Sequence, residues 1–126
     1  MSLRTPLGRV LGHGSAKDGT DHFVSQRISA IALAILGLWF LYSMLTIETM
    51  TYLDVFRFLA QPLNTVLMSL LCLTVAYHSW LGVQVVIEDY VHTPGTKLFS
   101  LIVSRFAHAF VAFACVYAIM RTGFGS

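Results

Sequence analysis

Three ionisable side chains, His78, Arg105 and His108, stand inside long apolar stretches of this sequence. Ionisable groups are costly inside a membrane, so such residues are candidates for a functional role. His78 is the most isolated, because it lies in the uncharged stretch 58–87. An imidazole in that position must hydrogen-bond to a neighbouring helix or bind a metal ion. Its residue type alone leaves both possibilities open.

The spacing around His78 gives the metal hypothesis a specific form. His78 and Asp89 are 11 residues apart, which in an α-helix means about 16 Å along the axis and a shared face, with Gly82 between them. Histidine is a usual axial ligand of haem iron, and a glycine one turn away leaves room for a flat porphyrin. The alternative is a hydrogen-bonded structural histidine, with Gly82 as a helix-packing residue.

Arg105 and His108 share one helical face, and Arg105 follows Lys97 by only 8 residues. We therefore expect the Arg105 side chain to extend to the inner membrane surface. His108 is either a second haem ligand or a polar contact within a subunit interface, and we favour the contact.

Other polar residues gather where apolar stretches end. Arg27 precedes the first stretch, and Asp89 and Tyr90 follow the second. A guanidinium can hold a carboxylate such as a haem propionate by paired hydrogen bonds, although a plain surface anchor is the alternative. Tyr90 beside Asp89 could hydrogen-bond and help to protonate a quinone that enters from the lipid. Tyr90 could also be only an interfacial aromatic residue.

The composition indicates which elements position these residues. The chain has 126 residues, of which 56% are hydrophobic and 11% are charged, whereas soluble domains are about 25% charged. So few charges cannot cover a soluble domain of this size, and the hydrophobicity excludes disorder. A net charge of +2 without a basic stripe does not favour a nucleic-acid partner. The composition is typical of a small integral membrane protein.

The uncharged stretches predict an all-α fold with three transmembrane helices, completed by a partner subunit. The helices are expected at about 27–48, 63–89 and 98–120, within a transmembrane domain of residues 27–121. Residues 48–61 include an amphipathic segment that is expected to lie on the membrane surface. Pro94 and Gly95 predict a turn before the third helix. Cys72 and Cys115 lack CxxC spacing and are interpreted as small apolar residues.

Basic residues predict the orientation. Residues 1–27 contain four of them, Arg4, Arg9, Lys17 and Arg27, whereas the next polar segment contains only Arg57. The positive-inside rule therefore predicts residues 1–26 to be cytoplasmic and 122–126 to be periplasmic, in a bacterial inner membrane. Residues 1–26 lack the apolar core of a signal peptide. A mitochondrial presequence, with location in the mitochondrial inner membrane, is the alternative.

Two motifs resemble a known family. The stretch His78-Ser79-Trp80-Leu81-Gly82, followed by Asp89-Tyr90, is similar to the H-[AS]-W-x-G…D-Y signature of the small, D-type membrane anchor of succinate dehydrogenase. Residues 19–30, GTDHFVSQRISA, resemble that family's G-x-[HD]-[HD]-F-x-x-x-R-x-[ST]-A pattern. The resemblance covers roughly residues 18–121.

The resemblance implies a role for each matching residue. His78 would be an axial ligand of haem b iron, beside Gly82, with the second ligand from a C-type cytochrome b anchor subunit. Arg27 would pair with a haem propionate. Tyr90 would hydrogen-bond ubiquinone, and Asp89 would support that site. Electrons would pass from succinate through FAD and iron–sulfur clusters of partner subunits to the quinone, linking the tricarboxylic acid cycle to electron transport.

The chain itself has no flavin or cluster motif, so no catalytic activity is expected when it is isolated from those subunits. Three alternatives remain at this point: a cytochrome b-type anchor of another quinone-linked oxidoreductase, a small transporter, and a passive anchor. A transporter usually carries an acid within its spans, whereas the six acids here lie outside the apolar stretches or at their ends. The quinone used, the oligomeric state and the physiological direction do not follow from the sequence.

Overall fold

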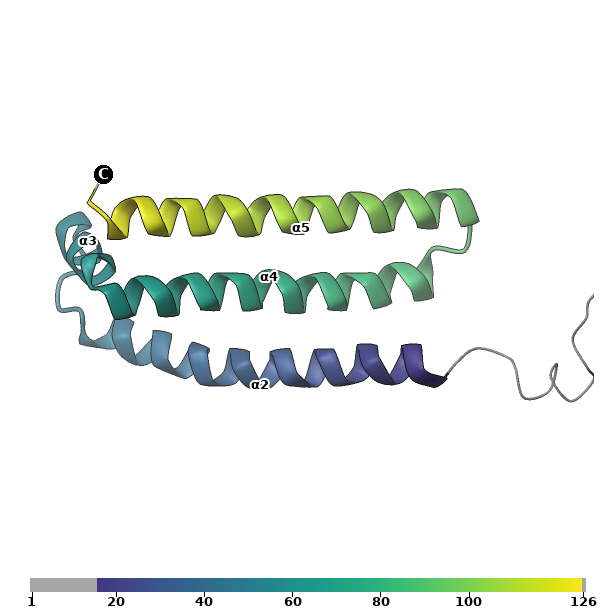
Figure 1. Cartoon of the computed structure of the whole chain (residues 1–126), viewed down its shortest axis with the longest axis horizontal. Helices are drawn as coiled ribbons and strands as arrows, with labels where there is room; N and C mark the ends of the chain where they lie inside the picture. Colours follow the sequence, from purple (N-terminus) through teal and green to yellow (C-terminus); the bar gives the residue numbers. More distant parts are fainter. Residues whose placement is uncertain (1–15, 126) are drawn as a thin grey trace, which may run out of the picture.

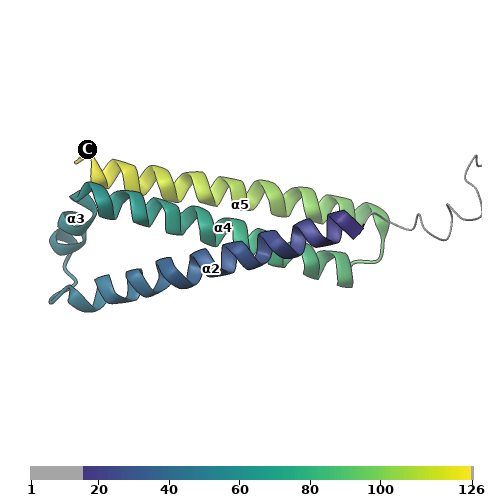
Figure 2. The ribbon, with the colours of Figure 1, turned by 60° about the horizontal axis from the view of Figure 1, so that its bottom comes forward.

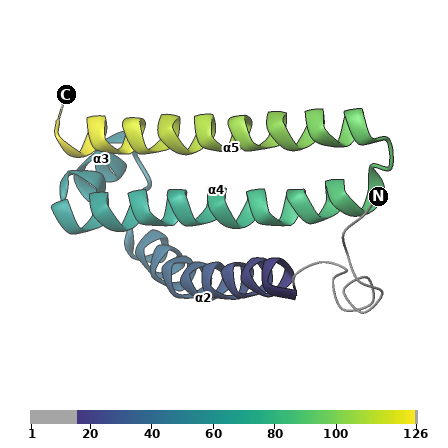
Figure 3. The same ribbon diagram turned by 45° about the vertical axis from the view of Figure 1, so that its right-hand side comes forward.

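The computed structural model describes residues 16–125, which form four helices and, within that range, no strand. The helices are α2 (Ala16–Thr46), α3 (Tyr52–Ala60), α4 (Pro62–Tyr90) and α5 (Pro94–Gly123). The three long helices lie side by side, with α4 between α2 and α5 (Figures 1 and 3). The all-α prediction is therefore confirmed. Arg4 and Arg9, which support the orientation prediction, lie outside the described residues.

Each of the three long helices is long and apolar enough to cross a membrane, so the chain is an integral membrane protein with three spans. The second helix matches its expected range of 63–89 to within one residue at each end. Pro62 is its first residue, where the missing N–H costs no hydrogen bond.

The first helix starts well before its expected boundary near residue 27. α2 begins at Ala16 and ends at Thr46. The sequence boundary was placed at the edge of the apolar stretch, but helical hydrogen bonding continues through polar residues when no proline interrupts it. His22, Ser25 and Gln26 in this polar extension are half-buried. The segment before the apolar stretch is therefore a continuation of the helix.

The short helix α3 confirms the amphipathic segment expected between the first two spans. Thr51 and Asp54 form a capping box: the Thr51 hydroxyl oxygen accepts from the Asp54 N–H, and the Asp54 carboxylate accepts from the Thr51 N–H at 3.1 Å. Hydrogen bonds from the Thr49 and Thr51 hydroxyls lower the pKa of Asp54. α3 packs against the ends of α4 and α5, and its Phe58 stacks with Trp39 of α2 at 6.1 Å.

The expectation of a turn at Pro94 and Gly95 was wrong in its position. The connection between α4 and α5 is residues 91–93, and α5 already begins at Pro94. Proline is well suited to the first turn of a helix, so Pro94 is the first residue of α5 and not part of the connection before it. The Lys97 Nζ donates to the Glu88 carbonyl oxygen at 2.8 Å and links the facing ends of the two helices.

The three spans enclose little apolar interior. Among residues 19–125, Leu36 and Leu81 are the buried apolar side chains, and Ser29, Ser43 and Thr65 are the buried polar ones. α2 runs obliquely to the pair formed by α4 and α5 (Figure 2) and, among the described residues, packs on α4 of this pair and not on α5. The helix contacts therefore depend on small polar residues, as is common in membranes, and most large apolar side chains face outward.

Candidate functional site

His78 lies on the side of α4 that faces α2. Its Nδ1 is 2.8 Å from the hydroxyl oxygen of Ser29, which is only 5% exposed. The Ser29 hydroxyl in turn donates to the Gln26 carbonyl oxygen, 3.0 Å away in the same helix. The two helices are therefore joined by a partly buried polar contact in the middle part of α4.

The other ring nitrogen of His78 has no such contact. No hydrogen bond of Nε2 occurs among residues 19–125, and the atom remains accessible. One turn further along α4, a Cβ atom added at Gly82 would meet no atom within 4 Å. An available nitrogen beside an open, side-chain-free helix surface fits an axial ligand of a flat macrocycle.

The donor set also restricts the kind of metal site. In the part of the chain that the structure describes, no group of three or more His, Cys, Asp or Glu side chains could hold a metal ion. A site assembled from several protein ligands is therefore not formed within residues 19–125. A haem needs only one or two axial protein ligands, so a single histidine is compatible with it.

Asp89 and Tyr90 lie at the end of the bundle opposite α3, whereas Arg27 is the twelfth residue of α2 and lies near the level of Ser29 and His78. The three side chains are therefore not gathered at one surface as expected, and they are not paired with one another within residues 19–125. The Arg27 guanidinium lies 5.3 Å from the centre of the Phe23 ring. Tyr90 is 79% exposed, and Asp89 beside it is also exposed. These three side chains are therefore available for groups outside the chain.

Glu88 contrasts with its neighbour Asp89, because its contacts are within the chain. Gln84 Nε2 donates to the Glu88 carboxylate at 2.9 Å, and Lys97 Nζ donates to its carbonyl oxygen. Contacts of Glu88 therefore hold the end of α4 in place, whereas the side chains of Asp89 and Tyr90 that follow are exposed.

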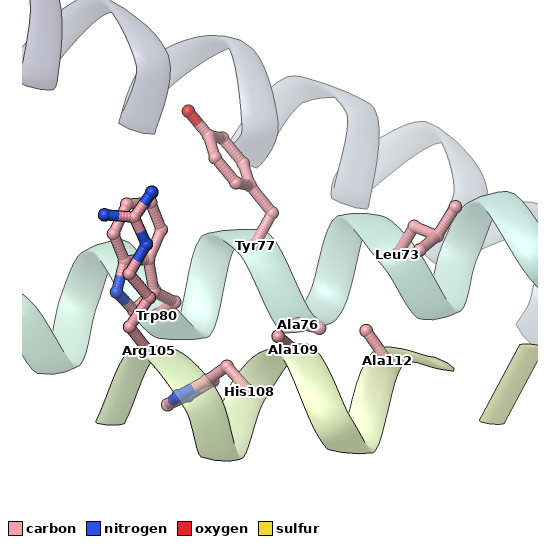
Figure 4. A pocket seen from close by; sticks show the side chains of 8 residues that line it. All are labelled: Leu73, Ala76, Tyr77, Trp80, Arg105, His108, Ala109 and Ala112. Carbon is pink, nitrogen blue, oxygen red and sulfur yellow. The ribbon is translucent and has the colours of Figure 1, made fainter. Parts of the chain in front are cut away.

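His108 is surrounded differently from His78. Its Nδ1–H donates to the Ser104 carbonyl oxygen at 2.7 Å, so the Nε2 atom can accept from the Ser79 hydroxyl at 3.2 Å. Both ring nitrogens are thus used between α4 and α5 of this chain. The Arg105 guanidinium lies over the Trp80 ring at 5.6 Å (Figure 4), which is a cation–π contact within the helix pair.

The family described as succinate dehydrogenase/fumarate reductase transmembrane subunit matches residues 1–119. The succinate dehydrogenase hydrophobic membrane anchor subunit of Rickettsia bellii is 37% identical over 89 residues, 71% of each chain. The corresponding subunit of Paracoccus denitrificans is 28% identical over 126 residues, covering 100% of this chain and 97% of that one. This chain belongs to the succinate dehydrogenase/fumarate reductase transmembrane subunit family.

The sequence of this family member does not reveal two contacts of its histidines, with Ser29 and Ser79, or the contact of Arg105 with Trp80. In the sequence, these three partners are only members of the two motifs. A serine at a helix-facing position is a weak signal, because hydroxyls often bond to their own helix. The contact with His78 links residues 49 positions apart, so it depends on how α2 packs against α4.

Two cavities flank His108 between α4 and α5 of this transmembrane subunit. The one in Figure 4 has a volume of about 250 Å³ and includes Trp80, Arg105 and His108 in its lining. The other, of about 330 Å³, lies beside Cys72, Ser79 and Cys115. The two cysteines are free and half-buried, which agrees with their interpretation as small apolar residues.

Proposed function

We propose that this chain is the hydrophobic membrane anchor of a succinate dehydrogenase complex, in which it helps to hold haem b and to form the site of ubiquinone reduction. The observation that carries this proposal is His78, whose Nδ1 is hydrogen-bonded inside the chain while its Nε2 is available. Membership of the transmembrane subunit family supports the assignment of the complex. The similarity to the Paracoccus denitrificans anchor subunit extends over the whole chain.

The haem side of the proposal involves His78, Gly82 and Arg27. His78 Nε2 would hold the haem iron from this chain, and the open surface at Gly82 would leave room for the macrocycle. Arg27 pairs with a propionate, because a guanidinium forms two parallel hydrogen bonds with a carboxylate. When bound, the haem supplies one-electron redox chemistry, with a potential that depends on its ligands and on nearby charge.

The second iron ligand comes from a partner subunit. His108 is a poor candidate, because both of its ring nitrogens are already hydrogen-bonded within this chain. A histidine of a C-type cytochrome b anchor subunit supplies the ligand instead. An iron–sulfur subunit and a flavoprotein subunit carry the clusters and the FAD, and succinate is oxidised there.

The quinone side of the proposal involves Tyr90 and Asp89. Both side chains are exposed at the end of α4, where a quinone in the lipid and water on the inner side can both reach them. The Tyr90 hydroxyl donates to a quinone carbonyl oxygen, and Asp89 supports the site or the delivery of protons. Reduction of a quinone needs two protons as well as two electrons, so a site at the water boundary is suitable.

In this proposal, the quinone end of the bundle faces the cytoplasmic side of a bacterial inner membrane. The start of α2 and the first turn of α5, which contains Lys97, lie at that end, whereas α3 and the last turn of α5 lie at the other (Figure 1). The positive-inside rule favours this orientation. The peripheral subunits then dock on the cytoplasmic side, close to Tyr90.

The test compares two histidine variants in the purified complex. His78→Leu is expected to remove or strongly weaken the Soret band, because it deletes the iron ligand, whereas His108→Ala is expected to keep it. Retention of flavin and iron–sulfur signals shows that the His78→Leu complex has assembled. An unchanged haem spectrum in His78→Leu would contradict the ligand assignment.

A further inference from the structure

We infer that Ser29 is the positioning residue of His78: it holds the imidazole in the Nδ1–H tautomer and directs Nε2 toward the iron. This inference rests on the proposed function, in which His78 is the haem ligand. Its basis is the hydrogen-bond chain from the imidazole of α4 through the Ser29 hydroxyl to a backbone carbonyl of α2.

Which group donates in each of these two hydrogen bonds follows from counting the available hydrogens. A serine hydroxyl has one hydrogen and can also accept. Both contacts of the Ser29 hydroxyl are hydrogen bonds at the same time only when its single hydrogen goes to the Gln26 carbonyl oxygen, which can only accept, at an O···O distance of 3.0 Å. The Ser29 oxygen is then an acceptor for His78, and Nδ1 at 2.8 Å must carry the hydrogen. In a neutral imidazole, Nε2 is therefore left with a free lone pair.

Burial of Ser29 favours its hydroxyl over water as the hydrogen-bond partner of His78 Nδ1. Ser29 is 5% exposed, so water does not readily take its place as the partner of Nδ1. The Ser29 hydroxyl is also oriented by its own helix, because the Gln26 carbonyl is only three residues away. A hydrogen bond between a buried hydroxyl and a half-buried imidazole on two helices fixes the rotation of the ring as well as its tautomer.

The hydrogen bond also affects the electronic character of the ligand. An imidazole whose N–H is donated to an acceptor is a more basic ligand, and a more basic ligand favours ferric over ferrous iron. Removing the acceptor should therefore weaken haem binding and raise the midpoint potential of the haem. Second-sphere partners of this kind typically change affinity by about 10–100-fold.

The experiment uses Ser29→Ala in the purified complex, with Ser43→Ala as the matched control. Ser43 is also a buried serine of α2, 7% exposed, but its hydroxyl donates to the Trp39 carbonyl oxygen of its own helix at 2.8 Å. Haem affinity is measured by transfer to apomyoglobin, and the midpoint potential by optical redox titration. A tenfold change in the ratio of ferric to ferrous affinity corresponds to a shift of ~59 mV.

We expect Ser29→Ala to release haem about 10–100-fold more readily and to have a higher midpoint potential than the wild type. Ser29→Thr keeps the hydroxyl and is expected to restore both values. Ser29→Cys supplies a weaker acceptor of similar shape and is expected to raise the potential too, so it serves as the second variant if Ser29→Ala does not assemble. Ser43→Ala should change neither quantity.

The outcomes separate this inference from the proposed function. If His78→Leu loses haem but the Ser29 variants have the affinity and potential of the wild type, the role of Ser29 is refuted and the ligand assignment stands. If His78→Leu retains haem, both are refuted. Equal shifts in the Ser29→Ala and Ser43→Ala complexes would indicate a general effect of helix packing and would also overturn the inference.

Discussion

At the scale of single residues, the structure distinguishes two histidines that the sequence places in similar apolar surroundings. His108 uses both ring nitrogens for contacts between α4 and α5. His78 uses one nitrogen toward Ser29 and leaves the other available. Because a metal ligand needs a free lone pair, the difference in hydrogen bonding favours His78 as the ligand and assigns His108 to helix packing.

Gly82 provides a test of the surface next to His78. Replacement by leucine should obstruct the macrocycle, because a bulky side chain would occupy the space against the helix. Overpacking typically costs about 1–3 kcal/mol, so haem affinity should fall by roughly 5- to 150-fold. Gly37→Leu is the control, because a Cβ atom added at Gly37 of α2 also meets no atom within 4 Å. Equal haem contents in the two variants would argue against the proposed position of the haem.

Tyr90 tests the quinone site separately from the haem. Tyr90→Phe removes the hydroxyl but keeps the aromatic ring, which is 79% exposed in this chain. Losing one hydrogen bond that is specific to the substrate should lower quinone reduction, while succinate oxidation by an artificial acceptor continues. The ratio of these two activities is the measurement. Parallel loss of both would indicate faulty assembly, and an unchanged ratio would exclude Tyr90 from the site.

At the scale of elements, contacts at the two ends of the bundle hold the helices in register. At one end, α3 packs against α4 and α5 and contacts α2 through Phe58 and Trp39. The Thr65 hydroxyl donates to the Leu59 carbonyl oxygen there. At the other end, Lys97 links α5 to the last turn of α4. These contacts therefore stabilise the relative positions of the helices on both sides of the middle region, where His78 lies.

Gly123 tests how closely α5 must approach α4 and α3. A Cβ atom at this position would be 2.6 Å from the Thr65 Oγ1 and 3.1 Å from the Leu59 carbonyl oxygen. Gly123→Ala should therefore destabilise the complex by about 1–3 kcal/mol, the usual effect of overpacking, and lower its thermal midpoint. Combining it with Thr65→Ala removes the nearest atoms, so the double variant should lose less stability than the sum of the single variants. Strict additivity would contradict the contact.

At the scale of the whole molecule, three apolar helices form an arrangement that encloses very little. α2 touches α4 but not α5, and large apolar side chains on all three spans are exposed, including Ile35, Leu70 and Phe110. Lipid can cover some of this surface. The rest is available for other subunits of the complex, which the family membership implies.

The orientation is a property of the whole molecule and can be tested with introduced cysteines. His92→Cys lies in the connection between α4 and α5, and Thr49→Cys lies in the connection between α2 and α3. If the quinone end faces the cytoplasm, an impermeant thiol reagent added to intact spheroplasts should label Thr49→Cys and not His92→Cys. Inverted vesicles should give the opposite result. Labelling of His92→Cys from outside would reverse the proposed topology.

Local patterns in the sequence determined much of this protein. The three spans follow from runs of apolar residues, α3 follows from its amphipathic spacing, and the position of His78 relative to Asp89 follows from helical geometry. These properties depend on residues that are near one another in the chain. For the same reason the sequence misplaced the start of α2, because the edge of an apolar stretch marks a lipid boundary and not the end of helical hydrogen bonding.

Only the tertiary structure decided which side chains meet. The contacts of His78 with Ser29 and of His108 with Ser79 join residues 49 and 29 positions apart. Such pairs depend on the register and the rotation of one helix against another, and many side chains along both helices set these together. Hydropathy and spacing indicate that a histidine lies in the membrane. The packing of α2 on α4 determines that one ring nitrogen of His78 is hydrogen-bonded, and the packing of α5 on α4 determines that both ring nitrogens of His108 are.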